Sequence, residues 1–373
     1  MLRNRKIFTL VCAIIILLDT TTYAHSKSEL FYSHIDQPNS VDIFFAGDLM
    51  LHGAQFKSAY RPSSKTYDFR SWFHHMAEPI ASADYALLNF ETTITDNPSA
   101  YSGYPLFRSP HHILYDLKAI GFDGVMTANN HSLDGGLKGL LTTVAHLEKA
   151  GLGYTGTAPM GQSVKPLLVE RKGFKIAFVN ATYGTNGMPI PKDHPRGINL
   201  ISEETLVEQM DLAKALNPDA IVAYVHWGTE YARQPNSYQK QWAKRIAELG
   251  ASAIIGAHPH TIQPEEWLTT TDGRQVYVNY SLGNFVSNQR WRYSDTGLAI
   301  TLRFSKDGVT PIKVVHHPFW VDKETASGAI DYTVIPFFNQ QILKRLSEKD
   351  KRLIKEATSD FFELYPNKKK ALP

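Results

Sequence analysis

The stretch VDIFFAGD, residues 41–48, decides which fold the sequence predicts. Residues 41–46 are mostly β-branched or aromatic, which favours a strand, and the glycine and aspartate that follow are typical of a strand end. The carboxylate of Asp48 is therefore expected just past the strand. Further along the chain, short apolar runs alternate with glycine-rich or polar segments and amphipathic helices, a pattern that indicates an α/β protein.

Four more apolar runs end next to side chains that can bind metal. The runs cover residues 85–88, 124–128, 220–225 and 253–256, and the side chains that follow them are Glu91, Asn130, His226, His258 and His260. Because ligands of α/β sheets bind in the crevice outside the strand ends, we expect these groups to converge with Asp48. Divalent cations bind carboxylate, carboxamide and imidazole groups. Each residue taken alone also fits a structural role, such as capping a turn or hydrogen bonding in the core.

The remaining elements are predicted to complete the fold. They are two helices, two strands and a charged C-terminal helix, at residues 137–150, 238–249, 297–304, 309–315 and 339–364. The first two helices each end on a glycine, as helices often do. We assign residues 38–305 to the main domain, and residues 306–373 to strands and a helix that complete it.

The first 24 residues are typical of a secretory signal peptide. Three basic residues precede an apolar run at residues 7–18, which is shorter than the roughly 20 residues that span a bilayer. Small residues favour cleavage after Ala24, which predicts a periplasmic, extracellular or cell-surface protein; an uncleaved membrane anchor is the alternative. The only cysteine, Cys12, lies in this segment, so the mature chain is expected to contain no disulfide.

The charge distribution argues against a nucleic-acid partner. Charged residues make up 20% of the chain and the net charge is +3, without a stripe of lysine and arginine. The only basic run, residues 368–370, is expected to be a solvated tail.

Five motifs follow the order found in the calcineurin-like metallophosphoesterases. They are Gly47-Asp48, Asn89-x-Glu91, Asn130-His131, His226-Trp227-Gly228 and Gly256-x-His258-Pro259-His260. The longer strings GDLM, ANNHSLD, HWGTEY, GAHPH and YSLGNF, which begin at residues 47, 128, 226, 256 and 280, resemble more specifically the CapA family of poly-γ-glutamate capsule proteins. The resemblance extends over about residues 41–289.

This resemblance implies a four-layer α/β/β/α sandwich with two mixed sheets and metal at one edge. It also implies the ligands of two divalent ions: Glu91, Asn130, His226 and His258 for one, and Asp48, the bridging Glu91 and His260 for the other. Mn, Zn, Fe and Mg all suit such ligands.

The sequence departs from ordinary phosphoesterases at the second ion. Met50 stands where histidine is usual, and Asn89 and the longer Glu91 replace the aspartate that usually follows a glycine in the second motif. A thioether binds Mg or Mn poorly, so the second ion is expected to be weak or absent, which leaves one or two ions per chain. His52 is close enough in sequence to replace the missing histidine; the alternative is an ordinary loop histidine.

His131 and Asp134 resemble the Asn-His-x-x-Asp pair of nucleotidase-type relatives. There the histidine protonates the leaving group or stabilises charge, and the carboxylate fixes its tautomer. The alternative is that Asp134 caps the helix expected at residue 137. Arg108 is a candidate for binding a substrate carboxylate or phosphate, or else an ordinary surface arginine. Trp227, Tyr231 and Trp291 suggest a polymer-binding groove, although core packing is the simpler interpretation of Trp227.

Three functions remain open at this stage. The resemblance implies an exported metal-binding protein of poly-γ-glutamate synthesis, export or anchoring, acting through metal-dependent hydrolysis, with an anionic polymer as substrate and membrane-bound capsule-synthesis partners. The alternative is a phosphoesterase or other metal-dependent hydrolase unrelated to capsule. A substrate-binding protein with a structural metal is disfavoured, because four protein ligands usually close a structural site and this chain offers more.

Overall fold

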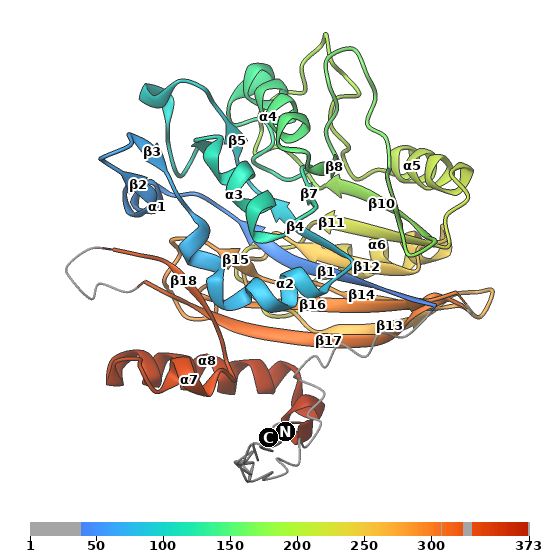
Figure 1. Cartoon of the computed structure of the whole chain (residues 1–373). Helices are drawn as coiled ribbons and strands as arrows, with labels where there is room; N and C mark the ends of the chain where they lie inside the picture. Colours follow the sequence, from blue (N-terminus) through green and yellow to red (C-terminus); the bar gives the residue numbers. More distant parts are fainter. Residues whose placement is uncertain (1–38, 307, 324–329, 372–373) are drawn as a thin grey trace, which may run out of the picture.

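Two mixed β-sheets face each other across an apolar core, and helices cover their outer faces (Figure 1). The computed structural model describes residues 39–306, 308–323 and 330–371. The predicted signal peptide, residues 1–24, and Cys12 lie outside the described residues. None of the described helices has the length and apolar character that a membrane span requires.

The first sheet combines a parallel half with an antiparallel half. In spatial order its strands are β18 (Thr333–Pro336), β17 (Gly308–Asp322), β16 (Thr296–Ser305), β1 (Ser40–Leu49), β4 (Tyr85–Phe90), β7 (Gly124–Met126) and β8 (Gly153–Thr155), and β15 (Asn284–Val286) also pairs with β1. Strands β1, β4, β7 and β8 run parallel, so their carboxyl ends meet at one edge. Strands β16 to β18 extend the sheet in antiparallel fashion on the other side of β1.

The second sheet has a parallel centre with antiparallel edge strands. Its order is β13 (Glu265–Thr269), β14 (Gln275–Asn279), β12 (Ala253–Ala257), β11 (Ala220–His226), β10 (Phe174–Thr182) and β9 (Leu167–Arg171). Two short pairs lie apart from both sheets, β2 (Tyr60–Arg61) with β3 (Thr66–Tyr67), and β5 (Thr93–Ile94) with β6 (Arg108–Ser109).

Helices form the two outer layers. The outer face of the first sheet is covered by α1 (Gly53–Ala59), η1 (Arg70–Met76), α2 (Ala77–Ser82), α3 (His112–Ile120) and α4 (Gly136–Ala150). The outer face of the second sheet is covered by α5 (Glu203–Ala215) and α6 (Ser237–Glu248). The protein is therefore a four-layer α/β/β/α sandwich, which confirms the fold class.

The C-terminal segment differs in two details from the sequence prediction. The second strand expected there is longer, because β17 runs to Asp322 beside the whole length of β16. The single helix expected from residue 339 is two helices, α7 (Gln340–Leu343) and α8 (Glu348–Leu364). The chain breaks between them because Ser347 takes an extended conformation and its side chain caps α8 by accepting from the Asp350 backbone.

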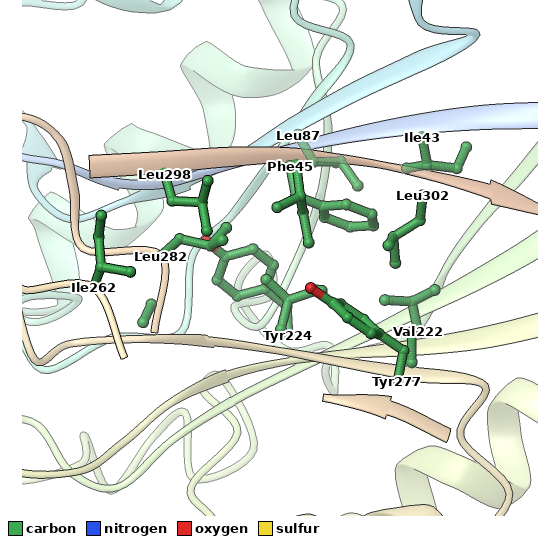
Figure 2. Close-up of a cluster of buried hydrophobic side chains, with 14 of the residues drawn as sticks. Ile43, Phe45, Leu87, Val222, Tyr224, Ile262, Tyr277, Leu282, Leu298 and Leu302 are labelled. Atoms are coloured by element: carbon green, nitrogen blue, oxygen red, sulfur yellow. The ribbon is translucent and has the colours of Figure 1, made fainter. Parts of the chain in front are cut away.

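Strand β1 is buried on both faces, which explains its nearly continuous apolar run. Ile43 and Phe45 point toward the second sheet, where they meet Val222 and Tyr224 of β11 (Figure 2). The intervening Phe44 packs among the outer helices. Alternation along residues 41–46 thus joins the two apolar clusters. Between Ala46 and Asp48 the register with β4 shifts by one residue, and Leu49 therefore lies in the same cluster as Phe44.

We predict that Tyr224→Phe lowers the free energy of unfolding by about 1–2 kcal/mol, because a buried carbonyl loses its hydrogen bond. The Tyr224 hydroxyl donates to the Ala46 carbonyl at 2.8 Å and so joins β11 to β1, where the pairing of β1 with β4 is irregular. Urea unfolding measures the change. Tyr154→Phe is the control, since that hydroxyl bonds only the solvent-exposed Glu148 carboxylate and a smaller change is expected. Equal losses in both variants would contradict the assigned role.

Candidate metal centre and cleft

The predicted metal ligands lie together at the edge where the parallel strands of both sheets end. Asp48 is the last but one residue of β1, and Glu91 follows β4 directly. His226 is the last residue of β11, and His258 and His260 follow β12. Asn130 follows β7, and all six side chains are at most 3% exposed.

Close contacts connect the members of this cluster. The Asp48 carboxylate lies 3.2 Å from His260 Nδ1 and accepts from the His258 backbone N–H at 3.2 Å. Glu91 Oε1 lies 3.5 Å from His226 Nε2 and 3.9 Å from His260 Nε2. Asn130 Oδ1 lies 2.9 Å from His226 Nε2.

The residues present fit a divalent cation. Two sets of ligand atoms converge to within 4.8 Å, one from Asp48, Glu91 and His226, the other from Glu91, His258 and His260. Glu91 Oε1 and His258 Nδ1 are buried and have no hydrogen-bond partner among the described residues. Such orphaned atoms are costly unless a cation binds them. Glu91 belongs to both sets, as expected for a bridging ligand, whereas the division of the other ligands between two ions stays a prediction.

The electrostatics of the cluster also favour a cation. Burial raises the pKa of Glu91 well above its usual value, and the neighbouring Asp48 carboxylate adds to the effect. Burial lowers the pKa of His226 and of His258 well below the usual value, so both imidazoles are neutral, the form that binds metal. A positive ion would relieve the repulsion between the two carboxylates.

Two glycines let the backbone approach closely beneath Asp48. A Cβ at Gly47 would lie 1.8 Å from the Gly283 carbonyl oxygen, which instead accepts from the Asp48 backbone N–H at 3.0 Å. Gly283 itself has φ +69°, a conformation that favours glycine. The GDLM and YSLGNF strings are thus in contact, which explains why both contain glycine.

Asn89 is a member of the cluster that the sequence analysis treated only as a departure from the usual motif. Its side chain is fully buried, and Nδ2 donates to Asp48 Oδ1 at 2.8 Å and lies 3.2 Å from His226 Nδ1. It therefore orients two candidate ligands from outside the ligand set. A polar residue near the end of a buried, apolar strand is the sequence signal that could have identified Asn89 as part of the site.

His131 and Asp134 form the predicted pair. His131 Nδ1 lies 2.7 Å from Asp134 Oδ2, and both side chains are buried. The same carboxylate oxygen accepts from the Phe107 backbone N–H at 2.6 Å. Helix α4 has Gly135 at its N-cap and no side-chain capping bond, so the helix-cap interpretation of Asp134 is wrong. The catalytic role of the pair stays a prediction.

A cleft of about 520 Å³ opens beside this pair and the metal cluster. It is lined by Met50, His52, Tyr104, His131, Glu230, Tyr231, His260, Asn288, Gln289 and Trp291. Tyr231 and Trp291 meet edge to face at 5.1 Å, and both are partly exposed. Trp227 is fully buried and donates to the Tyr280 carbonyl at 3.0 Å, which confirms its core role.

His52 and Met50 both line the cleft, and whether His52 contributes to a second ion site stays a prediction. His52 Nδ1 is engaged with Gln55 Oε1 at 3.2 Å, and the Asn288 backbone N–H approaches it at 3.3 Å. Burial lowers the pKa of His52 to about 4. Neither converging set of ligand atoms contains His52, and Met50 presents a thioether where the usual motif has an imidazole.

Arg108 is held by the protein itself. Its Nε donates to the Asp134 carbonyl at 3.2 Å, and it is absent from the described residues that line the cleft. The structure therefore gives Arg108 a contact that supports the His131–Asp134 segment, and its substrate-binding role stays a prediction.

Two facing mixed sheets flanked by helices, with carboxylate, carboxamide and imidazole groups at one edge, define an α/β/β/α sandwich protein with a candidate metal centre. The profile of the bacterial capsule synthesis protein PGA_cap matches residues 42–289, and the chain belongs to this family. The resemblance read from the motifs is thereby confirmed.

Two curated relatives agree with this family assignment. The chain is 28% identical over 284 residues to the capsule biosynthesis protein CapA of Bacillus anthracis, covering 72% of this chain and 65% of that protein. It is 27% identical over 326 residues to the PGA biosynthesis protein CapA of Bacillus subtilis (strain 168), covering 83% and 81%. Among solved structures, a Mycoplasma pneumoniae phosphatase aligns with TM-score 0.47 at 15% identity, covering 83% of this chain and 98% of that chain. The Haemophilus influenzae NAD nucleotidase aligns with TM-score 0.48 at 14% identity, covering 86% of this chain and 62% of that chain.

Proposed function

We propose that this protein is an exported, metal-dependent component of the synthesis, export or anchoring of poly-γ-glutamate, and that its centre cleaves or transfers the polymer. One observation carries the proposal: a buried ligand cluster opens, beside a buried His–Asp pair, into a cleft. The choice of polymer rests on the relatives, which are a capsule biosynthesis protein and a PGA biosynthesis protein. Membrane-bound capsule-synthesis proteins are the partners that this role would require.

In this proposal, one set of side chains binds metal and another transfers a proton. Asp48, Glu91, Asn130, His226, His258 and His260 would bind one or two divalent ions, and such an ion supplies Lewis-acid polarisation of the scissile group. Asp134 accepts the Nδ1 proton of His131 and leaves Nε2 to hold or release a proton. His131 lines the cleft, so this proton can reach the leaving group of a bound substrate.

The cleft itself is not basic. No lysine or arginine is among the described residues that line it, and Glu230 adds negative charge. The carboxylates of a polyanion would then depend on metal for charge compensation. A polymer-binding role and a metal-binding role are therefore linked in this protein.

We predict that removal of metal weakens poly-γ-glutamate binding by about tenfold or more, because a charge-assisted contact contributes about 1.5–3 kcal/mol. Isothermal titration of chelator-treated protein with the polymer, before and after addition of Mn²⁺ or Zn²⁺, measures the effect. Polymer length analysed by gel filtration tests cleavage in the same samples. Equal affinity for poly-γ-glutamate with and without metal, together with no shortening of the polymer, would contradict the proposal.

A phosphoesterase unrelated to capsule is the second candidate, and the His131–Asp134 pair suits it equally well. A proton held opposite a metal centre suits an alkoxide leaving group as well as an amine. Aryl phosphomonoesters and phosphodiesters added to the metal-loaded protein separate the two functions. Release of the aryl alcohol, with the polymer unchanged, would favour the phosphoesterase.

A further inference from the structure

The outer helical layer of the first sheet carries a second group of metal-binding side chains. It consists of Asp96, in the loop after β5, His111, at the N-cap of α3, and His146, on α4. The group shares no residue with the centre at the sheet edge. We propose that Asp96, His111 and His146 form a separate site for a zinc-class transition-metal ion, which fixes the loop after β5 to helices α3 and α4.

The distances within this group are close to those of a tetrahedral site. Asp96 Oδ1 lies 2.7 Å from His146 Nε2 and 3.4 Å from His111 Nδ1, and the three ligand atoms all lie within 4.8 Å of one another. With zinc bonds of about 2.0–2.1 Å, neighbouring ligand atoms stand about 3.3 Å apart. The His111 and His146 rings are nearly parallel, with planes 4° apart, so binding one ion would require rotation of one ring as well as movements of about an ångström.

One ring nitrogen in the group is left without a hydrogen bond. His111 Nδ1 is shielded from water and has no hydrogen-bond partner among the described residues, although it faces the Asp96 carboxylate. The Asp96 carboxylate accepts from His146 and could accept from His111 as well, but at 3.4 Å the His111 contact is long and makes no hydrogen bond, so the Asp96–His146 pair alone does not explain the position of His111. A metal ion would use all three atoms at once.

Neighbouring rings hold the two imidazoles side by side, and the exposed side of Asp96 leaves one coordination position open. The rings of His111 and His146 stack at 4.5 Å with planes 4° apart, and His112 stacks on the other side of His111 at 4.5 Å. The Tyr115 hydroxyl lies 3.4 Å from His146 Nδ1, where an outer-shell partner of a ligating Nε2 belongs. Asp96 is 66% exposed beside a surface hollow of about 480 Å³, so water can supply a fourth ligand.

The position of this site connects it to the cleft. The loop that begins near Asp96 carries Tyr104, which lines the cleft, and Phe107, whose N–H binds Asp134. Helix α4, which carries His146, begins two residues after Asp134. An ion bound at Asp96, His111 and His146 would hold both segments that position the His131–Asp134 pair.

The test uses the full chain with the first centre disabled by Glu91→Ala and His258→Ala. Zinc titration against a chromogenic chelator should leave about one ion per chain in this double variant, and Co²⁺ should give tetrahedral visible absorption. Adding His111→Ala or His146→Ala should lower the affinity for that ion by about 100-fold or more, beyond the roughly 10–100-fold loss that an outer-shell substitution causes. Adding His112→Ala, which removes a stacked ring but no ligand atom, should leave the ion bound.

Circular dichroism checks that each variant is folded, and a second comparison avoids the double variant altogether. In the otherwise unchanged protein, His146→Ala should lower zinc content by one ion relative to His112→Ala. No zinc in the double variant, or zinc that is insensitive to His111→Ala and His146→Ala, overturns the proposal.

Discussion

Glu91→Ala should empty the buried centre of metal. Glu91 is the one residue that belongs to both converging sets of ligand atoms, so its removal breaks both at once. We expect its loss to weaken binding by more than the roughly 10–100-fold that an outer-shell substitution costs. His258→Ala should have a smaller effect on metal content, because the set formed by Asp48, Glu91 and His226 is left intact. Elemental analysis of the purified proteins gives ions per chain.

Two controls separate loss of metal from loss of structure. Glu230→Ala removes another carboxylate, one that lines the cleft but belongs to neither set, and should keep its metal. In the metal-free protein, Glu91→Gln, which removes the charge and keeps the side-chain volume, should not lower the free energy of unfolding, since burial raises the pKa of Glu91 and disfavours its charged form. Undiminished metal in Glu91→Ala would remove the basis for a centre at this edge.

The amino-acid sequence predicts where the metal centre lies in the fold better than it predicts the contacts between the side chains of the centre. Strand ends can be recognised because residues 43–46 of β1 and 220–225 of β11 are apolar, so the first polar side chain after each run marks the edge of its sheet. Parallel pairing then requires Asp48 and Glu91 to lie close together. Strand ends point to the candidate ligands, and the resemblance of the five motifs to a known family favours metal binding over a structural role for them.

Other features depend on contacts between residues distant in sequence. Whether Asp134 caps a helix or binds His131 depends on the direction of one side chain, and both options satisfy the same sequence pattern. His258 and His260 have positive φ values, 97° and 57°, which only the surrounding structure can impose on residues other than glycine. The group of Asp96, His111 and His146 combines a loop with two helices, so no strand end marks it.

The C-terminal segment shows the same distinction. Its apolar and charged periodicity predicts strands followed by a helix, and these elements are present. Periodicity does not predict the break before α8, since this depends on the local conformation of Ser347.

His131→Ala should lower kcat by about 10²–10⁴-fold on whichever substrate the protein turns over, the usual contribution of a proton donor. Metal content should stay unchanged, because His131 belongs to neither converging set of ligand atoms. Asp134→Asn should also lower kcat, since Asp134 positions His131 by accepting its Nδ1 proton. KM should change less than kcat in both variants if the pair acts mainly in the transition state. Steady-state kinetics with metal analysis of the same samples measures these effects.

His75→Ala is the matched control, because this half-buried histidine lies on η1 and lines no part of the cleft. Its kcat should equal that of the unaltered protein. If His131→Ala keeps its metal and its polymer affinity while turnover is lost, the pair supplies the proton and the protein is an enzyme. If turnover persists unchanged, the proton comes from elsewhere and the assigned role is wrong. Combined loss of metal and turnover would place His131 in the ligand set, contrary to the separation that the structure shows.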